Sequence, residues 1–147
     1  MEFLSLEEVQ RIDRCALSGR EKFLTRLTVM AWHLLQHIGA ARSQAISDLQ
    51  VADIIEWFTT AQDLNWQGED LDFPESRQDE VSRTNLPTHQ KFLCRLAIRA
   101  RLVLMTIAAE VGTEVDQLTL PQILTWIEQE CAERRAKGEE PAFLAVQ

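Results

Sequence analysis

Apolar residues recur along the chain at the three- and four-residue spacing of an α-helix, which predicts an all-helical fold. The clearest stripe predicts a helix from about Gly19 to Ile38 or slightly beyond, with Gly39 available as its stop. Its members are Leu24, Leu27, Ala31, Leu34 and Ile38. Further apolar residues widen this stripe around most of the helix, which favours a central position in the fold.

The same stripe returns in the second half of the chain. A helix is predicted from near Pro87 to near Glu110, and Gly112 follows it as a terminator. Its stripe is Leu93, Leu96, Ala100, Leu104 and Ile107. A shorter helix is predicted after each long one, over about 47–62 and from Thr119-Pro121 to Gly138.

A further helix is predicted near the N-terminus. Ser5 and Glu8 have the spacing of a capping box, in which each residue satisfies a backbone amide of the other. Ser18 and Glu21 repeat this spacing and predict a break in the chain before the first long helix.

The two halves are similar in sequence when each position n is compared with position n + 69. Residues 22–62 and 91–131 then align without a gap and share 12 identities in 41 pairs. Two unrelated amphipathic helices would match at apolar positions only. They would not share the pairs Lys22/Lys91 and Arg26/Arg95, nor keep loops of equal length. The alignment therefore predicts a tandem duplication.

Each copy reads as a long helix, a loop and a shorter helix, which is an αα-hairpin. Such a unit cannot bury its apolar face alone, so two copies are expected to pack face to face. We predict an all-α, four-helix bundle with a pseudo-twofold axis and an additional N-terminal helix, forming one domain over residues 1–147. The repeats 22–62 and 91–131 are joined by an acidic link, 63–86, and the long helices should cross near Ala31 and Ala100.

The net charge of the chain argues against two classes of partner. A net charge of −8 repels phosphates and anionic lipid headgroups, so no nucleic-acid or membrane partner is expected. The main basic cluster, around Arg95 and Arg99, lacks the interleaved aromatics of a nucleic-acid surface. The longest apolar stretch, 102–109, is too short to span a bilayer, and the N-terminus does not resemble a signal peptide.

The cysteines are Cys15, Cys94 and Cys131, and they are not arranged as metal-binding pairs. Their odd number and wide spacing indicate reduced thiols in a cytoplasmic protein, with no cofactor implied.

His33 and His37 lie one helical turn apart, a spacing that can ligate a metal ion. The intervening glutamate of a metalloprotease helix is missing, and a third ligand would have to come from Cys15, Glu21 or the acidic link. The second copy has a leucine and a threonine at the two positions. The simpler interpretation is a pair of partly exposed histidines on a helix flank.

Arg26 and His33 lie two turns apart on one helix face, with six residues between them. This pair resembles the spaced Arg and His of HEPN-type ribonucleases, which are also helical. The resemblance implies that the Arg stabilises phosphate charge and the His moves a proton. It covers two residues only, and Leu27 stands where that family has a polar residue.

Two tryptophans fall outside the repeated pattern. Trp32 aligns with Arg101 of the second copy, and Trp66 lies in the link. If exposed, they mark a binding surface, because aromatic residues are enriched in interface hot spots. If they touch each other, they close the link over the bundle. The candidate interaction surface consists of Met30, Trp32, His33, His37 and Trp66.

The sequence therefore favours a non-enzymatic interaction or adaptor module that acts through protein–protein contacts or homodimerisation. It assigns no catalytic, cofactor-binding or metal-binding residue. The alternative is a metal- or phosphate-handling enzyme, either a HEPN-like ribonuclease or a metal-dependent hydrolase, centred on Arg26, His33 and His37.

Overall fold

The computed structural model describes residues 4–60 and 80–144, and over these residues the chain is helical without a strand. The α-helices are α1 (Leu6–Asp13), α2 (Gly19–Arg42), α3 (Val51–Thr60), α4 (Thr88–Val111) and α5 (Leu120–Ala136). Two short 3-10 turns, η1 (Ile46–Asp48) and η2 (Val115–Gln117), precede α3 and α5. The predicted all-α fold of two tandem helical repeats with an added N-terminal helix is confirmed.

The helix boundaries of the two copies correspond residue by residue. Adding 69 to the bounds of α2, 19 and 42, gives 88 and 111, which are the bounds of α4. The same shift carries 46–48 onto 115–117, and the start of α3 at 51 onto the start of α5 at 120. The two copies therefore share their helix boundaries as well as their sequence pattern.

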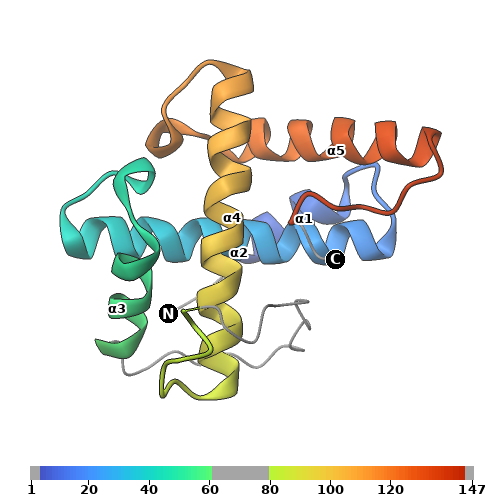
Figure 1. Cartoon of the computed structure of the whole chain (residues 1–147). Coiled ribbons are helices and arrows are strands. Elements are labelled where there is room, and N and C mark those ends of the chain that lie inside the picture. The colour runs from blue at the N-terminus through green and yellow to red at the C-terminus, as the bar shows by residue number, and fades with distance from the viewer. Residues whose placement is uncertain (1–3, 61–79, 145–147) are drawn as a thin grey trace.

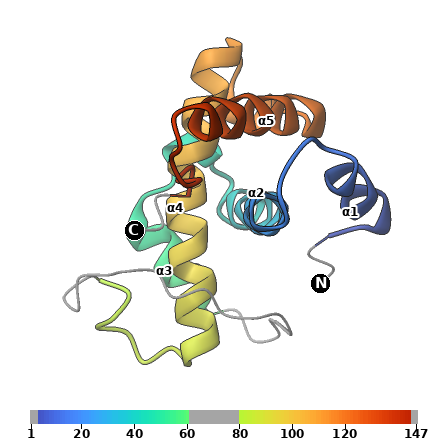
Figure 2. The same ribbon diagram turned by 90° about the vertical axis from the view of Figure 1, so that its right-hand side faces the viewer.

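The two long helices cross at the centre of the molecule (Figure 1). Both apolar stripes are buried there, and Ala31 and Ala100, where the crossing was expected, are fully buried. Helix α3 packs on α4, and α5 packs on α2, so a pseudo-twofold axis exchanges the two copies. Figure 2, which looks along α2, shows α1 on one side of this helix and α4 on the other.

The first copy is not a closed hairpin, because α3 turns away from α2 and lies along α4 instead (Figure 1). The loops fix this direction by binding each other. The Asp116 carboxylate accepts hydrogen bonds from the Ile46 amide at 3.1 and 3.3 Å. Arg101 of α4 donates to the carbonyls of Ile46 and Ser47 at 3.0 and 2.7 Å. The turn between α2 and α3 is thereby tied to the other copy.

Two predicted helix ends differ from the structure. Helix α2 continues past Gly39 to Arg42 and ends at Ser43, which adopts a left-handed conformation with φ 52°. Gly39 is buried inside the helix, where an added Cβ would lie 2.8 Å from the Gln44 carbonyl oxygen. This glycine therefore serves a close approach and not a helix stop. The predicted start of the third helix near residue 47 was also wrong, because residues 46–48 form η1.

Three other predicted helix ends are confirmed, while the predicted end of the third helix near residue 62 lies outside the described residues. The capping boxes Ser5/Glu8 and Ser18/Glu21 are both formed. Gly112 follows α4 in a left-handed conformation with φ 84°, as a C-terminal cap requires.

Candidate functional site

The flank of α2 that was predicted to form an interaction surface is largely covered. Met30 and Trp32 are only 2% and 7% exposed, so the prediction that they contribute to an exposed surface is corrected. His33 is half-buried and His37 is exposed, while Trp66 lies outside the described residues. Trp32 stacks on the His33 ring at a centroid distance of 5.1 Å. Helix α1 packs against α2 and contacts His33 on this flank.

His33 is the main polar contact between α1 and α2. Its Nε2 atom lies 2.6 Å from the Glu8 carboxylate, and its Nδ1 atom lies 3.2 Å from Oε1 of Gln36. Partial burial raises the pKa of the Glu8 carboxyl, but the backbone hydrogen bond from Ser5 and the His33 contact outweigh it and lower that pKa. Both ring nitrogens of His33 thus have polar partners, and the residue fastens α1 to α2.

Of the residues of the enzymatic alternative, His33 and His37 line one small pocket together with Glu8, and Arg26 is not part of the described lining of that pocket. Arg26 pairs with the Asp13 carboxylate at 3.5 Å, while His33 pairs with Glu8. Among the described residues, no three His, Cys, Asp or Glu side chains form a group that could hold a metal ion. The geometry around Arg26 and His33 is that of a helix-packing contact.

The repeated Lys and Arg pairs have a structural explanation. In the first copy, Lys22 donates to the Asp13 carbonyl oxygen at 2.8 Å, and Arg26 reaches the Asp13 side chain. Residue 82 is the counterpart of residue 13, because 13 + 69 = 82. In the second copy Lys91 donates to the Ser82 carbonyl oxygen at 3.3 Å, and Arg95 donates to the Ser82 hydroxyl at 2.7 Å. Both pairs fasten the segment that precedes a long helix.

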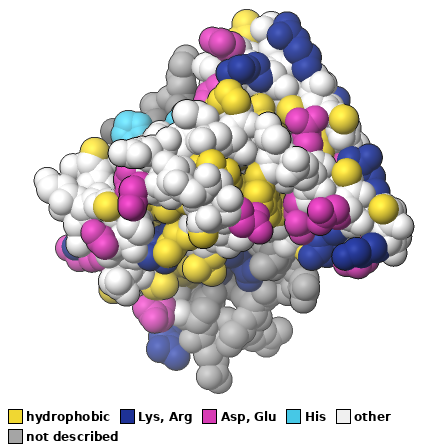
Figure 3. Space-filling model, turned by 90° about the horizontal axis from the view of Figure 1, so that it is seen from above, with side chains coloured by type: hydrophobic (Ala, Val, Ile, Leu, Met, Phe, Trp, Pro, Cys, Tyr) yellow, Lys and Arg dark blue, Asp and Glu magenta, His cyan; other side chains and the backbone are white. Residues whose placement is uncertain are grey.

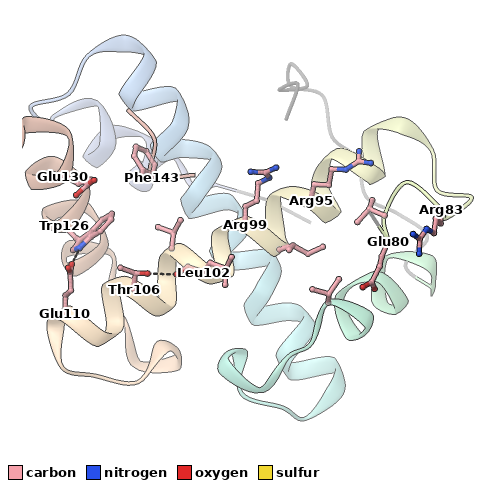
Figure 4. A pocket seen from close by; sticks show the side chains of 14 residues that line it. Glu80, Arg83, Arg95, Arg99, Leu102, Thr106, Glu110, Trp126, Glu130 and Phe143 are labelled. Atoms are coloured by element: carbon pink, nitrogen blue, oxygen red, sulfur yellow. Dashed lines mark hydrogen bonds between the residues drawn. The ribbon is translucent and has the colours of Figure 1, made fainter. Parts of the chain in front are cut away.

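A groove of about 920 Å³ runs along α4 and is the candidate functional site (Figure 4). Leu102 lies in the middle of it and is 58% exposed, which is unusual for a leucine in the centre of a long helix. Other apolar side chains of the lining come from α3, the segment before α4, α4 itself, α5 and the C-terminal segment: Val51, Val81, Ile98, Val103, Trp126 and Phe143.

The charged side chains of the groove are separated along its length. Figure 4 shows Arg83 and Arg95 towards one end, where Glu80 also lies, and Arg99 beside Leu102 nearer the middle. Glu110 and Glu130 lie at the other end, and the Trp126 indole donates a hydrogen bond to the Glu110 carboxylate. A narrow apolar floor thus lies between a mainly basic end and an acidic end.

The groove is the counterpart of the face that α1 covers in the first copy. Positions 99, 102 and 106 of α4 correspond to 30, 33 and 37 of α2 under the shift of 69. In the second copy Val81 and Ser82 take the places of Ile12 and Asp13, and Val81 is buried as Ile12 is. Helix α1 contacts this face of α2, whereas on the equivalent face of α4 the side chain of Leu102 is 58% exposed.

One protein family matches the chain twice, over residues 4–77 and 73–146, and its description is NDH complex assembly factor CRR9. The two matches differ by 69 at both ends (73 − 4 and 146 − 77), which is the shift found within the sequence. The chain belongs to this family. Neither the curated proteins nor the solved structures that were searched gave a match.

The CRR9 unit is longer than the repeat found within the sequence, because its first match begins at residue 4, ahead of α1. Helix α1 is therefore part of the duplicated unit. In the second match the counterpart of α1 is 75–82, since 6 + 69 = 75 and 13 + 69 = 82; of this segment, residues 75–79 lie outside the described ranges.

Two general features complete the description of this CRR9-family chain. No helix in the described part of the chain has the length and apolar character to cross a bilayer. On the face shown in Figure 3, Lys and Arg side chains stand among Asp and Glu side chains and do not form one basic patch.

The groove was not predicted from the sequence, although one signal for it is present there. Leu102 stands opposite His33 in the alignment of the two copies. An apolar residue where the other copy has a polar one indicates that the two faces have different coverings.

Proposed function

We propose that this chain is an assembly factor for an NDH complex and that it acts by binding a protein of that complex without catalysing a reaction. The observation that carries the proposal is the double family match, which extends from residue 4 to residue 146. Because both copies match, the function belongs to the duplicated unit as a whole.

The geometry supports a binding role. The groove along α4 offers an apolar floor with charged ends, which is the kind of surface that accepts a helix of another protein. On the α2 flank, His33 is engaged in holding α1 through its contact with Glu8. The partner in this proposal is a protein, and we keep the predicted cytoplasmic location as part of it.

The proposal is tested in cells that make both this protein and an NDH complex. Deleting the gene should lower the amount of assembled complex on native gels and leave unassembled subunits or subcomplexes. Restoring the intact chain should restore assembly. An unchanged level and size distribution of the complex after deletion would contradict the proposed function.

Self-association is the other form of protein contact that the sequence favoured. Sedimentation of the purified chain over a range of concentrations measures it directly. A monomer at all concentrations would confine the binding role to other proteins.

A further inference from the structure

We propose that the groove on α4 binds a short amphipathic helix of a partner protein, with its apolar stripe against Leu102 and acidic residues at the end that faces Arg95 and Arg99. The inference rests on the proposed function, because it specifies the kind of segment that an assembly partner would present. It commits to a helix because the fold already contains a helix on the equivalent face.

Helix α1 on α2 is the internal template for this complex. It is a capped, amphipathic helix of eight residues that buries Ile12 and contacts His33 through Glu8. The α4 face has the same backbone frame, since the bounds of α2 and α4 differ by 69 at both ends. A surface that is built to hold a helix in one copy is therefore repeated in the other.

The length of the groove sets the length of the occupant. Its lining on α4 extends from Arg95 to Glu110. At a rise of about 1.5 Å per residue this stretch measures about 22 Å, which matches about four turns of a bound helix lying along α4.

The apolar floor of the groove determines which type of residue the central turns of the bound helix present to it. Where α2 presents His33 to a carboxylate, α4 presents the exposed Leu102. A polar partner residue at this point would bury a hydrogen-bonding group without a partner, so the facing residue must be apolar. Trp126 and Phe143 add apolar surface on the side of the groove formed by α5 and the C-terminal segment.

The charged ends of the groove determine the order of acidic and basic residues along the bound helix. Among the described residues, Arg83 and Arg95 lie with Glu80 at one end and Arg99 lies between that end and Leu102, so a positive potential on this side of Leu102 favours acidic side chains of a partner. Glu110 and Glu130 attract basic side chains at the other end.

On the template, Asp13 at the end of α1 contacts Arg26, the counterpart of Arg95, while Glu8 contacts His33 further along α2. The bound helix therefore runs antiparallel to α4, with its basic residues in the first turn and its acidic residues in the last.

A second copy of this chain is a poorer occupant than a partner helix. Helix α1 is the chain's own amphipathic helix of this kind, and it is already seated on α2 through Glu8 and Ile12. Offering it to another molecule would expose the apolar flank of α2 that includes Met30.

The test uses a fluorescein-labelled peptide of about four turns. It has leucines at three- and four-residue spacing, lysines in the first turn and glutamates in the last. A scrambled peptide of the same composition lacks the stripe. The full chain should raise the fluorescence anisotropy of the striped peptide and not of the scrambled one. Leu102→Asp should weaken this binding at least tenfold.

Leu6→Asp is the matched control, because Leu6 is 73% exposed on α1 and lies outside the groove lining. This variant should bind the striped peptide like the wild type, and circular dichroism should show that both variants are folded. Arg99→Glu should weaken binding, with a smaller effect at high salt, where screening reduces the charge term.

Three results would overturn the inference: no preference of the wild type for the striped peptide, binding that Leu102→Asp leaves unchanged, or self-association that Leu102→Asp abolishes while the peptide does not bind. The last result would assign the groove to a second copy. If gene deletion still lowers the amount of NDH complex in any of these cases, the proposed function stands and only the groove assignment fails.

Discussion

Leu102 and His33 occupy equivalent positions in the two copies, yet Leu102 is 58% exposed while His33 lies 2.6 Å from the Glu8 carboxylate of α1. The backbone around them is the same, because the bounds of α2 and α4 differ by 69 at both ends. The difference lies in what covers each helix. Among the described residues, α1 occupies this face in the first copy, and Leu102 is exposed on the equivalent face in the second.

The contact between Glu21 and Arg135 should contribute measurably to stability. Glu21 is only 2% exposed, and its carboxylate lies 3.2 Å from the Arg135 guanidinium, which also donates to the Ala16 carbonyl oxygen. Arg135→Ala should lower the free energy of unfolding by about 1–2 kcal/mol, because it removes the ion-pair partner of a buried carboxylate. Chemical denaturation measures this change.

Arg134→Ala is the control for that experiment. Arg134 pairs with Glu130 and Glu139 near the surface, where ion pairs contribute about 0–1 kcal/mol. We expect the Arg135 variant to be the less stable of the two. Equal stabilities would show that the Glu21 carboxylate does not need its α5 partner.

The helix ends that correspond in the two copies should respond in opposite directions to substitution. Ser43 adopts a left-handed conformation with φ 52°, and its counterpart Gly112 has φ 84°. Ser43→Gly should raise the free energy of unfolding by about 0.5–1 kcal/mol, because glycine adopts this conformation without steric cost. Gly112→Ala should lower it by about 1 kcal/mol. Thermal and urea unfolding of both variants would test this, and a stabilised Gly112 variant would contradict it.

The three thiols should differ in reactivity. Cys15 is half-buried, while Cys94 and Cys131 are buried. Burial, followed by the nearby Glu21, raises the pKa of the Cys131 thiol to about 12, so almost none of it is thiolate at neutral pH. Titration of the native chain with a thiol-reactive dye should therefore modify Cys15 first and the other two only after denaturation.

The pH dependence of the modification of Cys15 by the dye is a second test of the packing around these thiols. Burial and the nearby Glu128 carboxylate raise the pKa of the Cys15 thiol above its usual value of 9.0. Its rate of modification should therefore still be rising at pH 9.0. A rate that levels off below this pH, or rapid modification of Cys131 in the native chain, would contradict the packing described for these residues.

The stability that Glu8 provides should depend on pH in a defined direction. Although partial burial opposes ionisation, the Ser5 and His33 contacts lower the pKa of the folded Glu8 carboxyl below 4.5. Its stabilising effect is therefore fully present above about pH 4.5 and is lost as the pH falls through the lowered value. Glu8→Gln, which can keep the capping hydrogen bonds, should be less stable than the wild type at about pH 6. The difference should shrink towards about pH 3 in urea denaturation, and a constant difference would show that the charge is not involved.

The sequence alone was sufficient to predict the helices and their repetition, because helix periodicity and capping are local properties, but it did not predict that α3 packs on α4 and not on α2. The stripes of α2 and α4, the capping boxes at Ser5 and Ser18, and the shift of 69 were all readable without coordinates. The prediction for Gly39 failed because its role depends on the Gln44 carbonyl oxygen, which is brought back against the helix by the following turn. Such a close approach leaves no periodic signal.

The candidate site was harder to predict, because exposure depends on which element covers a face. Met30 and Trp32 are buried, while Leu102 belongs to an equally clear helical pattern and is exposed. Trp32 also shows how one substitution changes a contact. Its counterpart Arg101 binds the η1 carbonyls, whereas the Trp32 indole N–H has no hydrogen-bond partner in the described part of the chain. The sequence alignment marks this position but does not indicate its environment.

The most direct test of the proposed function and its groove is the amount of assembled NDH complex in deletion cells that carry either Leu102→Asp or Leu6→Asp. Both variants place an aspartate at an exposed leucine of a helix, and only Leu102 lines the groove. We predict that the Leu6 variant restores assembly and that the Leu102 variant does not, although both chains accumulate to wild-type levels. Full restoration by the Leu102 variant would contradict a role for the groove in assembly.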